Sequence, residues 1–281
     1  MHAKKGGWIP YTKLAVAVIG SYVMLYPLLW MLSASFKPKS EIFRDAGLLP
    51  KTVTLENYIN GWQGIGGISF GHFFANSFFL VILAIIGNIL TCSMAAYAFA
   101  RLDFSMKKTF FGIMLASLML PHHVTLIPQY VFFFQLKWID TYLPLLVPKF
   151  LAAEAFFIFL MVQFIRGLPY ELDQAATVDG CGPIQTYTRI IFPLLLPALV
   201  TTAIFTFIWT WNDFFSQLIY ISNPQKLTVT LALRSFLDSM GDSSWGYLFA
   251  MSVLSLLPIF LFFVFSQRLL IEGISTTGLK G

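Results

Sequence analysis

The chain has 281 residues, of which 57% are hydrophobic and only 11% are Asp, Glu, Lys or Arg. Its formal net charge is +5 and its mean hydropathy is +0.75. Charged residues make up roughly 25% of ordinary soluble domains, so a soluble fold could not cover this much apolar surface. The composition predicts an integral membrane protein and excludes a disordered chain, a disulfide-rich secreted domain and a nucleic-acid-binding protein.

Six apolar stretches are long enough to cross a membrane, since a spanning helix needs about 20 largely apolar residues. The predicted helices cover residues 14–36, 75–100, 109–136, 141–165, 190–221 and 243–267. Lys149 and Glu154 interrupt the fourth stretch, which makes it the weakest of the six. We therefore expect an all-α, polytopic membrane fold with six transmembrane helices in one domain over residues 1–281.

Basic residues beside the spans predict the orientation of the chain in the membrane. They gather before the first span and in the short connection after the second: Lys4, Lys5, Lys13, Arg101, Lys107 and Lys108. The equally short connection after the third span carries only Lys137, beside Asp140. Both termini are therefore expected on the cytoplasmic side. Residues 37–74 are then external, although this longer segment carries basic residues as well.

Two prolines, Pro121 and Pro128, lie inside the third span, next to His122 and His123. An interior proline frees a backbone carbonyl that a neighbouring group or cavity water must satisfy. Broken helices are common where a bundle lines a transport pathway. A harmless kink explains any single proline as well, but two prolines beside two histidines favour a pathway.

Nucleotide, redox and metal chemistry have no motif in this sequence. There is no Gly-Lys pair, and therefore no Walker A loop, and neither a CxxC nor an HExxH motif is present. The two cysteines, Cys92 and Cys181, fall in an apolar span and a polar loop and predict no disulfide. If the protein drives uphill transport with ATP, another chain must bind the nucleotide.

Residues 166–192 carry the most specific pattern. Glu171, Ala175 and Val178 share one face of a predicted short helix. Gly180 can adopt the left-handed conformation that ends this helix, and Pro183 can begin a second one. The pattern predicts a helix-turn-helix that offers small apolar residues to a partner protein. The alternative is an amphipathic helix on lipid headgroups, but its polar face lacks the Lys and Arg that this role requires.

The same segment resembles the EAA loop of binding-protein-dependent ABC importer permeases. The residues that carry the likeness are Glu171, Ala175, Ala176, Asp179, Gly180, Ile191 and Pro193. The likeness continues through Pro121 and residues 54–58, 76–77, 95–102, 125–128, 211–214, 267–273 and 278–281. It covers nearly the whole chain and is similar to the carbohydrate-importing, maltose/alginate-type branch, and there to the shorter of the two permeases.

The resemblance implies a type I ABC importer permease fold and a set of partners. These are a second permease in a heterodimer, two ATP-binding subunits, an extracytoplasmic substrate-binding protein, a saccharide and membrane lipid, in the bacterial cytoplasmic (inner) membrane. ATP and Mg would bind on the ATPase subunits, so this chain is expected to hold no cofactor and to catalyse no reaction itself. The implied ATPase-coupling residues are Glu171, Leu172, Ala175, Ala176, Val178, Asp179 and Gly180.

Ionisable and aromatic residues inside the spans are the candidates for a substrate pathway, because intramembrane ionisable groups mark functional sites by default. They are His122, His123, Gln129, Lys149, Trp209, Trp211, Asn212 and Asp213. The imidazoles and the ammonium group suggest an acidic oligosaccharide of the oligouronide type. The alternatives are that Lys149 pairs with Glu154 or extends to the headgroups, that the histidines are neutral donors, and that the tryptophans form an interfacial belt.

Two other classes of protein compete with the importer. An ion-coupled secondary carrier of a small polar solute would need acidic residues at mid-membrane, and only Glu154 and Asp213 qualify. A structural scaffold would leave the pattern at 166–192 unexplained. The importer therefore remains the favoured class.

Overall fold

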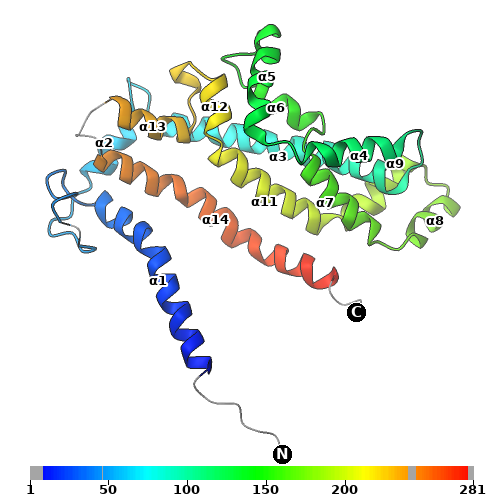
Figure 1. The fold of residues 1–281 in the computed structure, drawn as a ribbon, viewed down its shortest axis with the longest axis horizontal. Helices are drawn as coiled ribbons and strands as arrows, with labels where there is room; N and C mark the ends of the chain where they lie inside the picture. The colour runs from blue at the N-terminus through cyan, green and yellow to red at the C-terminus, as the bar shows by residue number, and fades with distance from the viewer. Residues whose placement is uncertain (1–8, 46, 240–244, 278–281) are drawn as a thin grey trace, which may run out of the picture. The chain divides into compact units, whose positions relative to one another are not determined.

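The computed structural model describes residues 9–45, 47–239 and 245–277, and for residues 9–11, 122–123, 238–239 and 268–277 it describes the backbone alone. In these ranges the regular structure is helical, and the one β-type pairing is an isolated bridge between Ile65 and Ile68. The all-α class is confirmed. The chain forms two compact units (Figure 1): one holds the described residues up to Phe70 with Leu233–Leu256, and the other holds Gly71–Ala232 and the chain from Leu257.

The first unit contains the long helix α1 (Ile9–Ser35) and the short helix α2 (Glu56–Gln63), joined by an extended connection. A completely buried lysine organises this connection: Lys37 Nζ donates to the carbonyls of Asp45 at 2.7 Å and Gly47 at 2.6 Å. Asn57 of α2 donates to the carbonyl of Lys37 at 2.8 Å. The connection is therefore fixed to α2 by buried hydrogen bonds.

The second unit is built around α3 (Phe70–Arg101), a 32-residue helix that at 1.5 Å per residue is about 48 Å long. It is followed by α4 (Lys107–Ser117), α5 (His122–Gln135), α6 (Leu143–Phe150) and α7 (Ala155–Arg166). Buried residues of α3, α7 and the later helices form its main hydrophobic cluster, which includes Cys92, Ala96, Phe157, Met161, Ile165, Ile191, Leu195 and Leu199.

The remaining elements are α8 (Glu171–Val178), α9 (Pro183–Thr186), the π-helical turn η1 (Tyr187–Ile191), α10 (Phe192–Leu194), α11 (Leu196–Asn212), α12 (Phe215–Tyr220), the 3-10 turn η2 (Pro224–Lys226), α13 (Val229–Ser239) and α14 (Trp245–Thr277). In Figure 1, α8 lies at the far end of the second unit, beyond α4 and α9. The sequence analysis did not predict α2 and α13. Both helices are short and contain polar residues, so neither forms a long apolar stretch.

Six uninterrupted spans are not confirmed. By length and hydropathy the described chain has four helical segments fit to cross a membrane, within Thr12–Ser35, Phe70–Arg101, Leu143–Arg166 (α6 and α7 taken together) and Trp245–Gln267. A fifth arises if Pro183–Leu194 and Leu196–Asn212, which bend by 73° at Leu195, count as one span. Pro193 and Pro197 flank that bend and supply its cause, since each removes a helical N–H donor.

Three predicted helices differ from the structure because the chain breaks inside them. The stretch 109–136 is divided between α4 and α5, where Pro121 adopts an extended conformation. The stretch 141–165 is divided between α6 and α7, where Ala152 has a φ of 53°. The stretch 190–221 breaks again after Asn212, and α14 continues past the predicted end at 267 to Thr277.

Candidate functional site

The helical hairpin of α8 and α9 has the turn that its sequence predicts. Gly180 has a φ of 78°, its N–H donates to Thr177 O at 3.1 Å, and the N–H of Cys181 donates to Ala176 O at 2.9 Å. This pair of bonds is the Schellman motif, which satisfies the last carbonyls of a helix. Pro183 then begins α9 at a position where no N–H donor is needed. The prediction for this turn is confirmed.

A buried ion pair fastens α8 to the end of α3. Arg101 Nε lies 3.0 Å from Asp173 Oδ2, and the two side chains are only 7% and 12% exposed. The same guanidinium donates to Leu168 O at 2.9 Å and lies 5.4 Å from the centroid of the Tyr170 ring. One arginine therefore contacts the segment before α8, its N-cap and its first turn.

Six of the seven predicted coupling residues are at least partly accessible. Glu171, Ala175, Val178, Asp179 and Gly180 are exposed, and Leu172 is half-buried. Ala176 differs from the expectation, because it is 2% exposed and faces its own chain. Its position one turn from Leu172 puts it on the inner side of α8, so its small size serves internal packing.

Two features of the hairpin escaped the sequence analysis. Ile184 at the start of α9 is 78% exposed and adds to Val178, which is 88% exposed, so the hairpin presents two large apolar side chains to its surroundings. The partnership of Arg101 with Asp173 was also missed, since the two residues lie far apart in the sequence. An aliphatic residue in an otherwise polar turn was the available signal for Ile184.

The predicted pathway residues Asn212 and Asp213 lie where the fifth stretch breaks. Asn212 Nδ2 donates back to Ile208 O at 2.8 Å, and Asp213 Oδ1 accepts from the N–H of Ser216, in the first turn of α12, at 3.1 Å. The buried Gln217 Nε2 donates to Thr210 O at 3.2 Å, and its Oε1 accepts from Thr228 and from Thr230. These contacts satisfy the polar groups that the break exposes.

The two tryptophans of α11 have different surroundings. Trp211 is 2% exposed and stacks on Phe207, with Phe74 and Phe78 of α3 against its edges. Trp209 is exposed and stacks on Phe157 of α7 at a centroid distance of 5.2 Å. Only Trp209 therefore offers an accessible aromatic face.

Lys149 is not a free cation. It forms an ion pair with Glu154 across the break between α6 and α7, with the side chains 23% and 28% exposed. The carbonyl of Lys149 accepts from Thr91 Oγ1 of α3 at 2.9 Å, where Gly87 leaves room for the close approach. The alternative that Lys149 pairs with Glu154 is confirmed, and the pair is neutral overall.

The remaining pathway candidates lie on α5. His122 and His123 are its first two residues, and their side chains fall outside the described part of the structure. Gln129 follows Pro128 on the same helix and is exposed. Among the candidates whose side chains are described, Lys149, Trp209 and Asp213 make their ion pair, ring contact and hydrogen bond with residues outside the set, so these contacts do not join them into one site. Among the described residues no group of three His, Cys, Asp or Glu could hold a metal ion.

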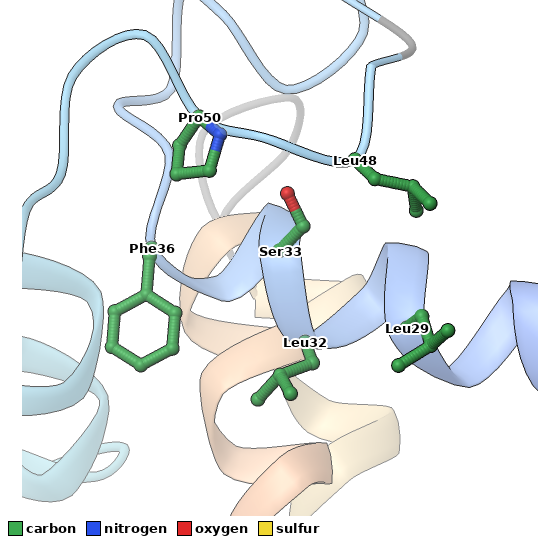
Figure 2. A pocket seen from close by; sticks show the side chains of 6 residues that line it. All are labelled: Leu29, Leu32, Ser33, Phe36, Leu48 and Pro50. Carbon is green, nitrogen blue, oxygen red and sulfur yellow. The ribbon is translucent and has the colours of Figure 1, made fainter.

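A separate hollow of about 340 Å³ lies in the first unit, beside the C-terminal end of α1 (Figure 2). Leu29, Leu32, Phe36, Leu48 and Pro50 line it with apolar atoms, and Ser33 supplies a single hydroxyl. A saccharide needs several polar partners, because each buried hydroxyl without a hydrogen bond costs free energy. This hollow is therefore not suited to a sugar.

Comparison with known proteins places these features in a family. The family described as "Binding-protein-dependent transport system inner membrane component" matches residues 87–275. The putative ABC transporter permease protein ORF2 of Caldicellulosiruptor sp. (strain Rt8B.4) is 33% identical over 256 residues, which are 91% of each chain. The arabinooligosaccharides transport system permease protein AraQ of Halalkalibacterium halodurans is 32% identical over 264 residues, 93% of each chain.

Two further proteins extend the comparison. The trehalose transport system permease protein SugB of Mycobacterium tuberculosis is 32% identical over 270 residues, 94% of this chain and 97% of that protein. A chain of a bacterial ABC transporter involved in the import of the acidic polysaccharide alginate has the same fold, with a TM-score of 0.85 over 95% of this chain and 98% of that one at 19% identity. The fold is that of a type I ABC importer permease, and the chain belongs to the family of binding-protein-dependent transport system inner membrane components.

Proposed function

We propose that this chain is one permease subunit of an ATP-driven, binding-protein-dependent importer of oligosaccharides. The observation that carries the proposal is the α8–α9 hairpin, which is fixed to α3 on one side and exposes Val178 and Ile184 on the other. Exposed apolar side chains on a rigid support favour a protein partner. In this role the hairpin docks into an ATPase subunit on the cytoplasmic side.

The partners follow from family membership. The chain forms half of a translocation pathway with a second permease, two ATPase subunits bind ATP and Mg below, and a substrate-binding protein delivers the sugar from outside. The chain itself binds no cofactor and catalyses no reaction. Nucleotide binding changes the affinity of the ATPases for the hairpin, because a ligand shifts a conformational equilibrium only by binding the two states differently.

Oligosaccharides are the proposed cargo, since relatives over nearly the whole chain are named for arabinooligosaccharides, trehalose and diacetylchitobiose. An acidic oligosaccharide is the narrower proposal. The likeness to the alginate importer supports it only at the level of fold. Lys149 supports it only when its ammonium leaves Glu154, because the pair in its present form carries no net charge.

The two acidic candidates of a secondary carrier are both engaged. Glu154 pairs with Lys149, and Asp213 accepts the N–H of Ser216 at the start of α12. A proton- or sodium-coupled carrier needs a carboxylate that is available to the ion. These contacts therefore favour the importer over the carrier.

The test is reconstitution of this chain into proteoliposomes with its companion permease, ATPases and binding protein. We expect ATP-dependent uptake of a labelled neutral oligosaccharide, an acidic oligouronide, or both. Uptake of the oligouronide that falls in Lys149→Ala, while neutral uptake is retained, would support the acidic cargo. Uptake by this chain alone on an ion gradient, with no ATPase present, would overturn the importer.

A further inference from the structure

The two ends of α3 are fastened to different parts of the second unit. At its C-terminal end, Arg101 holds Asp173, Leu168 O and the Tyr170 ring, as described above. Both charges of the Arg101–Asp173 pair are largely withdrawn from solvent. Water therefore screens their attraction less than it screens the attraction of an ion pair on the protein surface. The pair therefore attracts the first turn of α8 to the end of α3, and the hydrogen bond to Leu168 O adds a directional contact beside it.

At the other end, α3 holds the segment that joins α12 to α13, which we call the strap (residues 222–229). Asn76 Nδ2 donates to Gln225 O and Leu227 O, both at 2.9 Å, and His72 Nε2 donates to Gln225 O at 2.7 Å. The buried Ser77 Oγ accepts from the N–H of Val229 at 3.0 Å. Three polar side chains, which lie within two turns of α3, thus bind the strap's backbone.

The strap is also held from its far side. Asp140 Oδ1 accepts from the N–H groups of Ser222 at 3.1 Å and Asn223 at 2.8 Å. The Tyr142 hydroxyl donates to Lys226 O at 3.0 Å. The connection between α5 and α6 and the start of α3 therefore grip one segment between them, and a shift of α3 along its axis would move the strap.

The helix between the two ends is suited to transmit such a shift. α3 contains no proline and is unbroken, whereas the stretches 109–136, 141–165 and 190–221 are all interrupted. Asn76 and Arg101 are about 37 Å apart along the helix axis at 1.5 Å per residue. A contiguous rigid element with distinct contacts at both ends is a physical basis for coupling between distant sites.

We propose that α3 is the rod that carries a movement of α8 to the strap, and that Arg101 is the positioning residue at the joint. The proposal rests on the proposed function, since the movement of α8 is driven by the ATPase that grips it. When α8 moves, the Arg101–Asp173 pair makes α3 follow. Asn76 then transfers the displacement to the strap on the opposite side of the membrane.

The test compares uptake of substrate per ATP hydrolysed in the complete reconstituted complex. Arg101→Lys keeps the charge but loses the planar guanidinium that contacts Asp173, Leu168 O and Tyr170 together. We expect ATP hydrolysis per assembled complex to continue while uptake per ATP falls at least threefold. Asn76→Ala, at the far end of α3, is expected to give the same signature. The double variant is expected to be no worse than the more severe single variant, because both changes interrupt one path.

A charge exchange separates the joint from general stability. Arg101→Asp and Asp173→Arg are each expected to reduce uptake per ATP, and the combined exchange is expected to recover at least half of it. Lys108→Ala is the control, since this exposed basic residue lies in the first turn of α4, outside the hairpin. It is expected to leave uptake per ATP unchanged. If Arg101→Asp or Asp173→Arg fails to assemble, Arg101→Lys and the combined exchange decide.

The outcomes distinguish this proposal from the proposed function. A wild-type complex without substrate-stimulated ATP hydrolysis would overturn the importer itself. Suppose that the wild-type complex couples uptake to ATP hydrolysis, and that every assembled variant keeps the wild-type uptake per ATP. This result would overturn only the role of α3 as a rod. A purely structural role of these residues lowers hydrolysis and uptake in proportion to the amount of complex, so uptake per ATP stays unchanged. Uncoupling by Arg101→Lys but not by Asn76→Ala would overturn the transfer to the strap.

Discussion

Two ion pairs in the second unit differ in how far apart their partners lie in the sequence. Lys149 and Glu154 are five residues apart and close a gap within one stretch of chain. Arg101 and Asp173 come from different elements, and their side chains are more deeply buried, at 7% and 12% against 23% and 28%. The local pair repairs a break in a helix, while the distant pair joins two helices. The comparison suggests that only the second transmits movement.

Helix dipoles act on both pairs. Lys149 lies in the last turn of α6 and Glu154 directly precedes α7, so each charge faces the helix end that favours it. Asp173 has the same advantage in the first turn of α8, and Arg101 has it in the last turn of α3. The fold must in addition bring these two distant helix ends together. All four charges therefore lie at helix ends that favour them, and the two pairs differ in burial and in sequence separation instead.

The largest effect is expected from Asp173→Ala. Removing this carboxylate leaves the guanidinium of Arg101 buried without its counter-charge, which costs about 3–5 kcal/mol in comparable pairs. The expected result is a clear drop in the thermal unfolding midpoint of the purified protein. Asp179→Ala is the control, because this aspartate directly follows the same helix but is exposed. Equal midpoints for the two variants would contradict the role given to the pair.

A smaller loss is expected from Glu154→Ala. A hydrogen bond to a charged group contributes about 2 kcal/mol when one partner is removed, and the partial exposure of Lys149 lets its ammonium regain contact with water. A double-mutant cycle with Lys149→Ala measures the pair directly. A coupling free energy as large as that of Arg101 with Asp173 would erase the distinction between the two pairs.

Gly180→Ala tests the hairpin that the distant pair supports. A residue other than glycine at a φ of 78° costs about 1–2 kcal/mol, and a Cβ there meets nothing within 4 Å, so strain in the backbone is the sole cost. We expect a loss of about 1 kcal/mol in stability. Gly112→Ala, also in open space but inside the right-handed α4, is expected to be neutral or stabilising. If both variants lose stability, the positive φ of Gly180 does not explain the loss.

The smallest effect concerns the strap. The N–H of Asn223, followed by the N–H of Ser222 and the charge of Lys226, holds the pKa of Asp140 below its ordinary value of 3.8. A carboxyl with a lowered pKa in the folded state stabilises that state above pH 3.8, and this contribution is lost as the pH falls through the lowered pKa. The midpoint difference between wild type and Asp140→Asn should therefore shrink as the pH is reduced from 6 to 3.

The control for this titration is Asp103→Asn, whose carboxylate is fully exposed and lies 3.6 Å from Lys107. Exposed pairs of this kind contribute little, so its midpoint difference should stay near zero at every pH. A constant difference for Asp140→Asn across the range would mean that its contacts act by shape and not by charge.

Much of the hairpin could be predicted from the sequence because its structure is decided within a few residues. Gly180 is suited to the left-handed turn, and Pro183 is suited to the first position of a helix, whatever lies around them. The hydrophobic stretches likewise predicted α1, α3 and α14, since a long apolar run without charges has few alternatives in a membrane. The family followed from these local patterns in combination.

The tertiary structure decided what local patterns leave open. Proline and hydropathy together did not show that the third stretch divides at Pro121, or that Ala176 faces inward while Ala175 faces outward. The partner of Arg101 depends on where α8 packs after the chain has passed through two further apolar stretches. The sequence by itself determined membrane residence, the turn at Gly180 and the family, because these depend on composition and on neighbouring residues. Only the fold determined which distant charges meet, because that depends on the packing of whole helices.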